Sequence, residues 1–134
     1  MRALAAKCVE FCVRGDWSGV RRGLRTDRKA LERTLARYGE KGVEALAQAT
    51  PRRTGKTAES WRYRLEWTKE GAAIIWENDN APGGVPVALL LQYGHGTKSG
   101  VYVAGKDYIN PAMKPVFDQL SQELWKEVRG WPTR

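Results

Sequence analysis

The sequence predicts a small α+β protein, in which an antiparallel sheet is packed by a long helix from the N-terminal half and by a C-terminal helix. Three patterns predict this class. Residues 27–49 repeat apolar side chains at helical spacing, residues 60–67 alternate apolar with polar side chains, and residues 111–128 return to helical spacing. The 134 residues, 42% hydrophobic and 28% charged, suit one globular domain over residues 1–134.

The N-terminal segment, residues 1–26, is expected to be extended before the first helix begins. Residues 6–13 favour a strand, and the run Asp16–Gly19 favours a turn. Cys8 and Cys12 are the only cysteines, and no leader-like segment precedes them. We therefore expect reduced thiols rather than a disulfide or a metal site.

The first helix is expected over residues 27–49. Thr26 or Asp27 can cap it, because a short side-chain oxygen accepts the unpaired N–H groups of the first turn. Pro51 ends it, since the residue before a proline avoids helical angles. Gly39 and Gly42 each weaken the helix by about 1 kcal/mol relative to alanine, and they indicate a close helix crossing or a bend. The apolar stripe is Leu31, Leu35, Tyr38, Val43, Leu46 and Ala49.

The middle of the chain favours a hairpin between two loops. A loop over residues 51–57 leads into a strand at 60–67, in which Trp61, Tyr63, Leu65 and Trp67 share one face. A turn at 69–71 joins it to a second strand at 72–77. Residues 78–84 follow as a longer loop.

The last third of the chain contains one ambiguous run and one clear helix. Residues 85–93 fit a buried strand or a short helix, and Pro86 with Gly94 favours the helix. A loop over 94–100 and a short strand at 101–103 follow. Asn110 is the expected cap of the last helix and Pro111 its first residue, while Gly130 and Pro132 stop it. Its apolar stripe is Met113, Val116, Phe117, Leu120, Leu124 and Val128.

The net charge of +8 is concentrated in the first half of the chain. Residues 1–64 carry 16 Lys and Arg against 7 Asp and Glu, whereas residues 65–134 carry 7 against 8. A basic surface for nucleic acid and a solvated helix face both explain this asymmetry. The residues that could face DNA are interleaved with aromatic side chains, although a solvated strand face would look the same: Arg52, Arg53, Lys56, Arg62 and Arg64.

The sequence offers no recognisable catalytic, cofactor or metal site. His95 is the only histidine, and the spacing to Asp107, the nearest acid downstream, does not indicate that the two meet. Gly55-Lys56-Thr57 matches the end of a phosphate-binding loop, but the first glycine of that motif is replaced by Thr50. No apolar run approaches the roughly 20 residues that cross a bilayer. We expect no enzyme, no cofactor and no membrane partner.

Three short segments occur in an order that resembles a known family. They are Thr50-Pro51-Arg52-Arg53-Thr54-Gly55, then Tyr93-Gly94-His95-Gly96-Thr97, then Tyr108-Ile109-Asn110-Pro111-Ala112. With the helices and hairpin between them, residues 27–128 resemble the tail-component family of long-tailed bacteriophages. That family includes tail completion, or head–tail joining, proteins. Gln92 stands where the family often has an acid.

The resemblance implies a structural virion protein and no catalytic residue. Such a subunit would form a homo-hexameric ring at the head-proximal end of the tail, after assembly in the cytoplasm of the bacterial host. Its partners would be neighbouring neck and tail proteins (the head-completion or stopper protein, the tail terminator or the tail tube), and viral DNA would pass through it. A tail terminator and a small basic nucleic-acid-binding module are the alternative interpretations.

A closed ring needs two different contact faces on each subunit. We expect the loops to supply them. The candidate subunit- and partner-contact residues are Pro51, Arg52, Arg53, Thr54 and Gly55, then Asn78, Asp79 and Asn80, then Tyr93, Gly94, His95, Gly96 and Thr97, and finally Tyr108 and Pro111.

Overall fold

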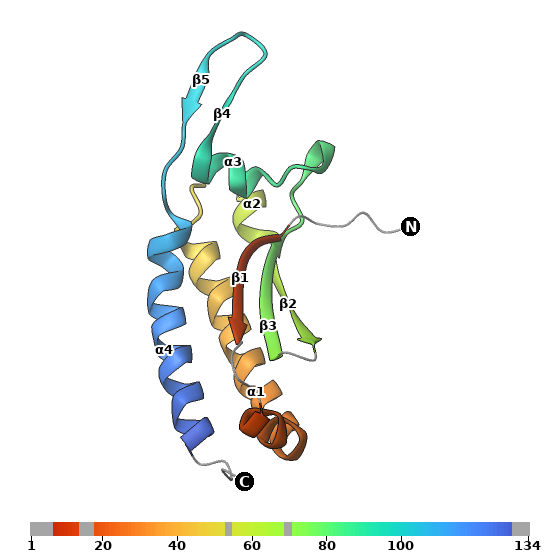
Figure 1. Ribbon diagram of the computed structural model, residues 1–134. Helices are drawn as coiled ribbons and strands as arrows, with labels where there is room; N and C mark the ends of the chain where they lie inside the picture. The colour runs from red at the N-terminus through yellow and green to blue at the C-terminus, as the bar shows by residue number, and fades with distance from the viewer. Residues whose placement is uncertain (1–6, 14–17, 53–54, 69–70, 130–134) are drawn as a thin grey trace.

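The computed structural model describes residues 7–13, 18–52, 55–68 and 71–129, and its architecture is α+β as predicted (Figure 1). A three-stranded antiparallel sheet has on one face two long helices, which lie side by side and run in opposite directions. The strands are β1 (Lys7–Val13), β2 (Trp61–Thr68) and β3 (Gly71–Asn78), and the helices are α1 (Ser18–Ala49) and α4 (Ile109–Arg129). The short elements α2 (Lys56–Glu59), η1 (Pro82–Gly84), α3 (Val87–Tyr93), β4 (Gly94–Gly96) and β5 (Tyr102–Ala104) lie at one end of this body.

The sheet has the order β1-β3-β2, so β3 is the central strand and is buried along its whole length. Because directly paired residues of antiparallel strands share a face, the register separates an apolar from a charged side. Phe11, Ile74 and Leu65 form one row on the face toward the helices. Arg62, Glu77 and Lys7 form a row on the other face.

Two glycines of α1 allow the helix to lie very close to the sheet. A Cβ atom at Gly42 would overlap the indole ring of Trp76, and one at Gly39 would lie 2.6 Å from Cε2 of Tyr63. The Trp76 indole is fully buried and donates a hydrogen bond from Nε1 to the Gly39 carbonyl oxygen, at 3.0 Å. The glycines therefore mark a close approach of helix and sheet, rather than a crossing of two helices.

Aromatic contacts connect α4 to the same core. Phe117 of α4 packs against Trp76 of β3 and Phe11 of β1, with ring centroids 5.9 Å and 5.2 Å away. At the helix–helix contact, Glu123 accepts hydrogen bonds from Arg37 at 2.9 Å and from the Tyr38 hydroxyl at 3.4 Å. One aromatic cluster thus joins helices and sheet into a continuous core.

Most of the predicted elements are confirmed. The strands at 6–13, 60–67 and 72–77 correspond to β1, β2 and β3, and the ambiguous run after Pro86 is the helix α3. The predicted stripes of α1 and α4 are largely buried, from Leu31 to Leu46 in one and from Met113 to Leu124 in the other. Residues 16–17 of the turn predicted at 16–19, residues 69–70 of the turn predicted at 69–71, and the stop at Gly130 and Pro132 lie outside the described residues, whereas Gly71 is the first residue of β3.

The predicted start of the first helix was wrong. The helix begins at Ser18, so Ser18 and Gly19 are helical and Thr26 and Asp27 lie inside the helix rather than at its cap. Thr and Asp are only about 0.7 kcal/mol less favourable than alanine within a helix, so a continuing helix readily includes them. The segment 1–26 was expected to be extended. In its described part only β1 is extended, and residues 18–26 are helical.

Several predicted loops are partly regular structure. Lys56 and Thr57 belong to α2, Asn78 is the last residue of β3, and Gly94–Gly96 forms β4. Helix α4 begins at Ile109, one residue before the predicted cap Asn110. Thr57, Asn78 and Ile109 have hydrogen-bond partners far along the chain, and such partners leave no local pattern.

We predict that Gly42→Ala destabilises the protein by about 1–3 kcal/mol. Alanine is the better helix former by about 1 kcal/mol, but its Cβ would overlap the buried Trp76 ring, and overpacking of that kind costs more than the helix gains. Urea unfolding would measure the free energy, with exposed Gln48→Ala in the same helix as the control. A variant more stable than the natural protein would contradict the close packing.

We also predict that the two cysteines differ in reactivity. Burial, with a contribution from the charge of Glu77 and opposed by a backbone hydrogen bond from Asn78, raises the pKa of Cys8 from 9.0 to about 11. Since the thiolate is the reactive form, Cys8 should alkylate about 100-fold more slowly than an ordinary thiol near pH 8, while the exposed Cys12 reacts readily. Mass spectrometry after iodoacetamide treatment of Cys8→Ser and Cys12→Ser would measure both rates. Equal rates would contradict the burial of Cys8.

Candidate functional site

Three of the four predicted contact segments meet around a pocket at the end of the body that carries α2 and α3, whereas Tyr108 and Pro111 do not line it. The pocket has a volume of about 400 Å³. Pro51, Gly55 and Thr57 line it from the first segment, Asn80 from the second and His95 from the third. Its apolar wall comes from α3, through Val87, Leu90 and Leu91. Segments that are far apart in the sequence thus form a single concave surface.

Hydrogen bonds between α2 and the end of β3 hold this pocket together. The Asn78 amide donates to the Thr57 carbonyl oxygen at 2.9 Å, and Asn78 Oδ1 accepts from the backbone N–H of Asn80 at 3.0 Å. Asn80 in turn donates from Nδ2 to Thr57 Oγ1 at 2.9 Å. Gly55 precedes α2 with a φ of 84°, a conformation that favours glycine.

Two of the predicted contact residues are part of the core instead. Asn78 is completely buried, and Tyr108 is only 4% exposed, with its hydroxyl donating to the Ala88 carbonyl oxygen at 2.7 Å. Burial also raises the pKa of Tyr108. The side chains of these two residues hold the fold together and are not available to a partner. Asp79 and Pro111 are exposed, as are Arg52, Tyr93, Gly96 and Thr97, while Arg53 and Thr54 lie outside the described residues.

Gln92 is a key residue of this region that sequence reasoning did not identify. Its Oε1 accepts hydrogen bonds from the backbone N–H groups of Tyr108 at 3.0 Å and Ile109 at 2.9 Å, which are the unpaired donors at the start of α4. Its Nε2 donates to Asp107 Oδ1 at 2.7 Å. A buried side chain of α3 therefore caps α4 and fixes the angle between the two helices.

Residues 93–104, which we call the arm, leave the body as a two-stranded ribbon (Figure 1). Gly94 has a φ of 86° and ends α3. A Cβ there would overlap the Tyr102 hydroxyl, which donates to the Tyr93 carbonyl oxygen at 3.0 Å. Just after the arm, a Cβ at Gly105 would lie 2.5 Å from the Gln92 carbonyl oxygen. Gly94 and Gly105 thus allow the two ends of the ribbon to lie close to the end of α3.

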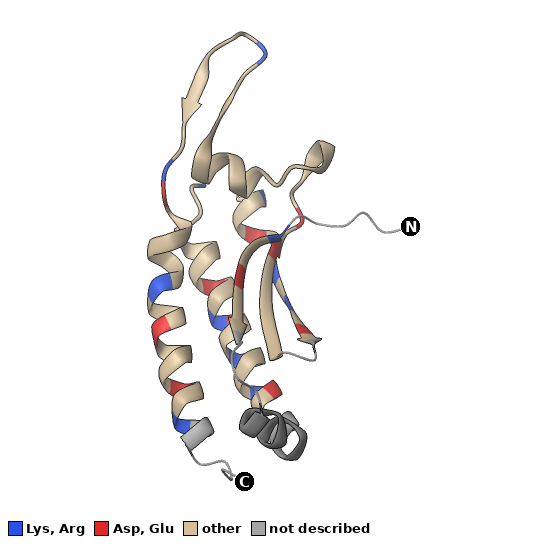
Figure 2. Cartoon of the chain, viewed as in Figure 1, with Lys and Arg blue, Asp and Glu red and all other residues tan. Residues whose placement is uncertain are grey.

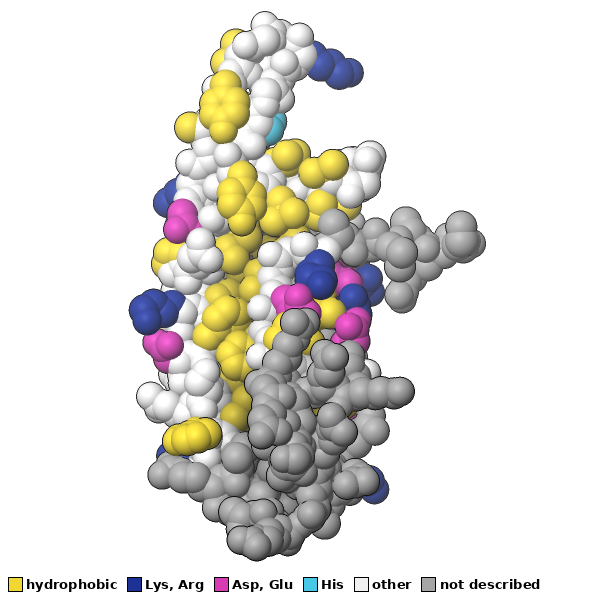
Figure 3. Space-filling model, viewed as in Figure 1, with side chains coloured by type: hydrophobic (Ala, Val, Ile, Leu, Met, Phe, Trp, Pro, Cys, Tyr) yellow, Lys and Arg dark blue, Asp and Glu magenta, His cyan; other side chains and the backbone are white. Residues whose placement is uncertain are grey.

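The arm exposes large apolar side chains. The exposed fractions are 69% for Tyr93, 60% for Val101, 64% for Tyr102 and 44% for Val103. In the view of Figure 3 several hydrophobic side chains lie on the arm and over α3. Lys98 is the one charged residue in the sequence of the arm, and Figure 2 shows the arm almost entirely uncharged. Contiguous exposed apolar surface of this kind is typical of a protein–protein contact.

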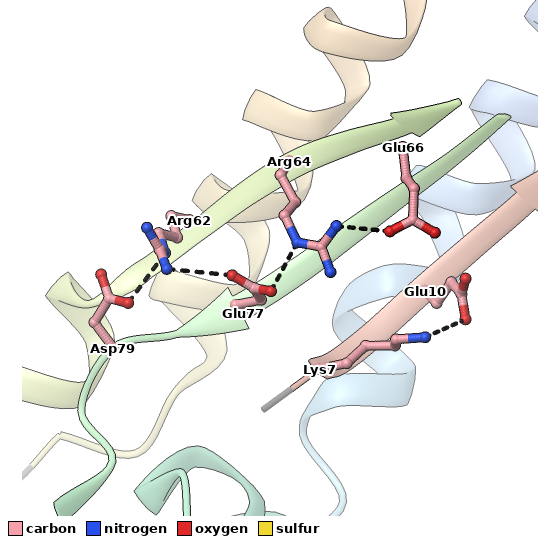
Figure 4. Close-up of polar contacts among 7 residues, drawn as sticks. All are labelled: Lys7, Glu10, Arg62, Arg64, Glu66, Glu77 and Asp79. Carbon is pink, nitrogen blue, oxygen red and sulfur yellow. Dashed lines mark hydrogen bonds and ion pairs between the residues drawn. The ribbon is translucent and has the colours of Figure 1, made fainter. Parts of the chain in front are cut away.

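The predicted DNA-facing arginines of β2 are paired with carboxylates on the charged face of the sheet (Figure 4). Arg62 lies 3.3 Å from Glu77 and 3.0 Å from Asp79, and Arg64 lies 2.8 Å from both Glu77 and Glu66. The hydrogen bonds that Arg64 donates to Glu77 and Glu66 raise the pKa of its guanidinium. The positive charge of both side chains is largely compensated, so this face offers little net attraction to phosphate. Arg52 and Lys56 are exposed beside the pocket, at the opposite end of β2 from its hairpin turn.

His95 lies in the pocket wall without a carboxylate beside it. The pocket lining contains no Asp or Glu among the described residues. The Asp107 carboxylate accepts hydrogen bonds from the side-chain amides of Gln92, at 2.7 Å, and Asn110, at 3.0 Å. The Nδ1 atom of His95 is buried and has no hydrogen-bond partner in the described part of the chain. Nothing here orients the imidazole as a general base.

The described residues contain no cluster of three or more His, Cys, Asp or Glu side chains that could bind a metal ion. None of their helices combines the length and the apolar character that a bilayer span requires.

Comparison with known proteins adds no relative. The chain matches no protein-family model, no curated protein and no solved structure.

We predict that Gln92→Glu destabilises the protein at pH 7 by about 2 kcal/mol. The introduced carboxylate would replace the amide that donates to Asp107, so two like charges would meet and the pKa of the pair would rise above about 4. A raised pKa in the folded state means that the penalty is present at neutral pH and is lost as the pH falls through that pKa. Unfolding at pH 7 and pH 4.5, compared with the natural protein, would measure it.

The double substitution Gln92→Glu with Asp107→Asn is the matched control. It restores one donor and one acceptor, and it should recover most of the stability at pH 7. A pH-independent loss, or no rescue, would contradict this arrangement.

Proposed function

We propose that this protein is a structural subunit of a tailed-bacteriophage virion, with the role of a tail completion or head–tail joining protein. It would associate with copies of itself into a ring at the head-proximal end of the tail. Its other partners would be the adjoining neck and tail proteins. Viral DNA would pass through the ring.

The observation that carries this proposal is the apolar arm. Folding buries most large apolar side chains of the body, apart from Val85 and Trp125, but leaves Tyr93, Val101 and Tyr102 more than half exposed on a projecting ribbon. A protein that acted alone in water would gain nothing from this surface, whereas a subunit of an assembly buries it against its neighbour. The assignment to a phage tail comes from the sequence, because the segments at 50–55, 93–97 and 108–112 occur in the order that resembles the tail-component family.

The chemistry of the pocket also supports a structural role over catalysis. His95 has no orienting acid, and the polar groups around it, Thr57 and Asn80, are engaged in holding α2 to β3. In the nucleic-acid alternative, Arg62 and Arg64 would have to leave their carboxylate partners. Within the ring proposal, Arg52, Arg53 and Lys56 remain the residues that could face DNA.

We predict that the purified protein self-associates to a species of about six subunits, near 90 kDa for a chain of 15.1 kDa. Light scattering across a range of protein and salt concentrations would give the mass, and electron microscopy would show whether the species is a closed ring. Because the contact is apolar, the mass should change little with salt. A strict monomer that binds DNA with a steep salt dependence would favour the nucleic-acid alternative instead.

A further inference from the structure

We propose that a lock at the base of the arm fixes the direction in which the arm leaves the body. The lock consists of the close backbone contact between Gly94 and Gly105 and of the hydrogen bond that the Tyr102 hydroxyl donates. Glycines at these positions and at Gly96 and Gly100 would by themselves favour a flexible segment, because glycine restricts the backbone least. The inference concerns the shape of the arm, so it goes beyond the proposed function and does not depend on which partner meets the arm.

The two ends of the arm lie against each other with no side chain between them. A Cβ at Gly105 would lie 2.5 Å from the Gln92 carbonyl oxygen and 2.5 Å from the Gly94 nitrogen. A Cβ at Gly94 would lie 2.7 Å from the Val103 carbonyl oxygen and 2.8 Å from the Gly105 nitrogen. These neighbours are backbone atoms, which cannot swing aside as the end of a flexible side chain can. Packing this close leaves the base of the arm little freedom to rotate.

Two hydrogen bonds hold the base in this arrangement. The Lys106 N–H donates to the Leu91 carbonyl oxygen at 2.9 Å, which ties the residue after the contact to α3. The Tyr102 hydroxyl donates to the Tyr93 carbonyl oxygen at 3.0 Å, which ties β5 to the start of the arm. In the β4–β5 register Tyr102 lies opposite Gly96, a residue without a side chain. An arm that left this direction would break both bonds.

The tip of the arm is closed by Thr97. Its N–H donates to the Val101 carbonyl oxygen at 2.9 Å, and its hydroxyl accepts a hydrogen bond from the Val101 N–H at 3.2 Å. Gly100, with a φ of 85°, donates from its N–H to the Thr97 carbonyl oxygen at 3.0 Å. The arm is therefore a hydrogen-bonded ribbon whose direction the lock sets as a unit. A preformed element of this kind spares its partner the cost of ordering it.

Hydrogen exchange of residues 93–106, followed by mass spectrometry, tests the lock. In the natural protein these amides should exchange roughly tenfold more slowly than in an unstructured chain. Gly105→Ala should accelerate their exchange about fivefold, because the added Cβ would force the two backbones apart. Tyr102→Phe, which removes only the hydroxyl, should accelerate it about threefold, the effect of one exposed hydrogen bond.

Each variant of the lock has a matched control on the same arm. Gly96→Ala adds the same methyl group at a position where no atom lies within 4 Å. Tyr93→Phe removes a hydroxyl that has no hydrogen bond among the described residues, from a ring that is 69% exposed against 64% for Tyr102. Both controls should exchange within about twofold of the natural protein. Exchange in the buried strand β3 would verify that each variant keeps the fold of its body.

Spin labels measure the direction of the arm itself. In a Cys8→Ser and Cys12→Ser background, labels would be attached through Lys98→Cys on the arm and Gln48→Cys on α1, both exposed positions. Dilution with unlabelled protein removes distances between copies. The natural arm should give one narrow distribution of distances, and Gly105→Ala should broaden it.

The outcomes separate the lock from the proposed function. Exchange of the natural arm at the rate of an unstructured chain, or a broad distance distribution, would overturn the lock. Equal exchange in Gly105→Ala and Gly96→Ala, or in Tyr102→Phe and Tyr93→Phe, would overturn it too. In these cases the proposed function stands, because a subunit can also order a segment on contact. A locked arm on a strictly monomeric protein would support the lock and contradict the proposed self-association.

Discussion

The packing of Trp76 against the backbone of α1 is the contact on which the rest of the structure depends. Gly42 leaves space on the helix surface for the indole, Gly39 leaves space for the Tyr63 ring, and the indole N–H donates to the Gly39 carbonyl oxygen. This pairing sets the separation of helix and sheet. Phe117 then packs on Trp76, which brings in α4 and, through Phe11, the edge strand β1. A large ring buried against two glycines has few alternative positions, because close-packed cores accommodate added volume poorly.

A second set of contacts fixes α3 against α4 at the end of the body from which the arm projects. Gln92 of α3 binds the first N–H groups of α4, and the Tyr108 hydroxyl binds the carbonyl oxygen of Ala88 in α3. The two helices are therefore joined by reciprocal hydrogen bonds in a buried setting, where an unmade bond is costly. The arm begins at Tyr93, directly after Gln92. Its direction is consequently set by the core of the protein, although its own side chains contact little of that core.

The spacing of apolar residues correctly predicted the helices and strands that are buried on one side only. The stripe from Met113 to Leu124 and the alternation from Trp61 to Trp67 are of this kind, and both were correct. The predicted start of α1 was wrong because Thr26 and Asp27, although they can cap a helix, are also tolerated inside a longer one. The cap made by Gln92 and the burial of Tyr108 could not be predicted, since each depends on a partner at least fifteen residues away. The sequence did identify the segments that meet at the pocket, because turns need particular residue types, but it could not indicate that they meet.

The charged side chains on the sheet face of the body have partners within the chain, whereas the large apolar side chains of the arm are exposed. In the body, the charged face of the sheet is compensated by its own carboxylates: Glu77 is buried between Arg62 and Arg64, and Lys7 pairs with Glu10. Such a face has little to gain from a partner, because its charges would have to be desolvated. At the arm and the pocket the opposite holds. Tyr93, Val101 and Tyr102 expose apolar surface there, and Nδ1 of His95 is buried without a hydrogen-bond partner among the described residues. In the assembly that we propose, the apolar surface of the arm would be the part of the molecule that gains most from a partner.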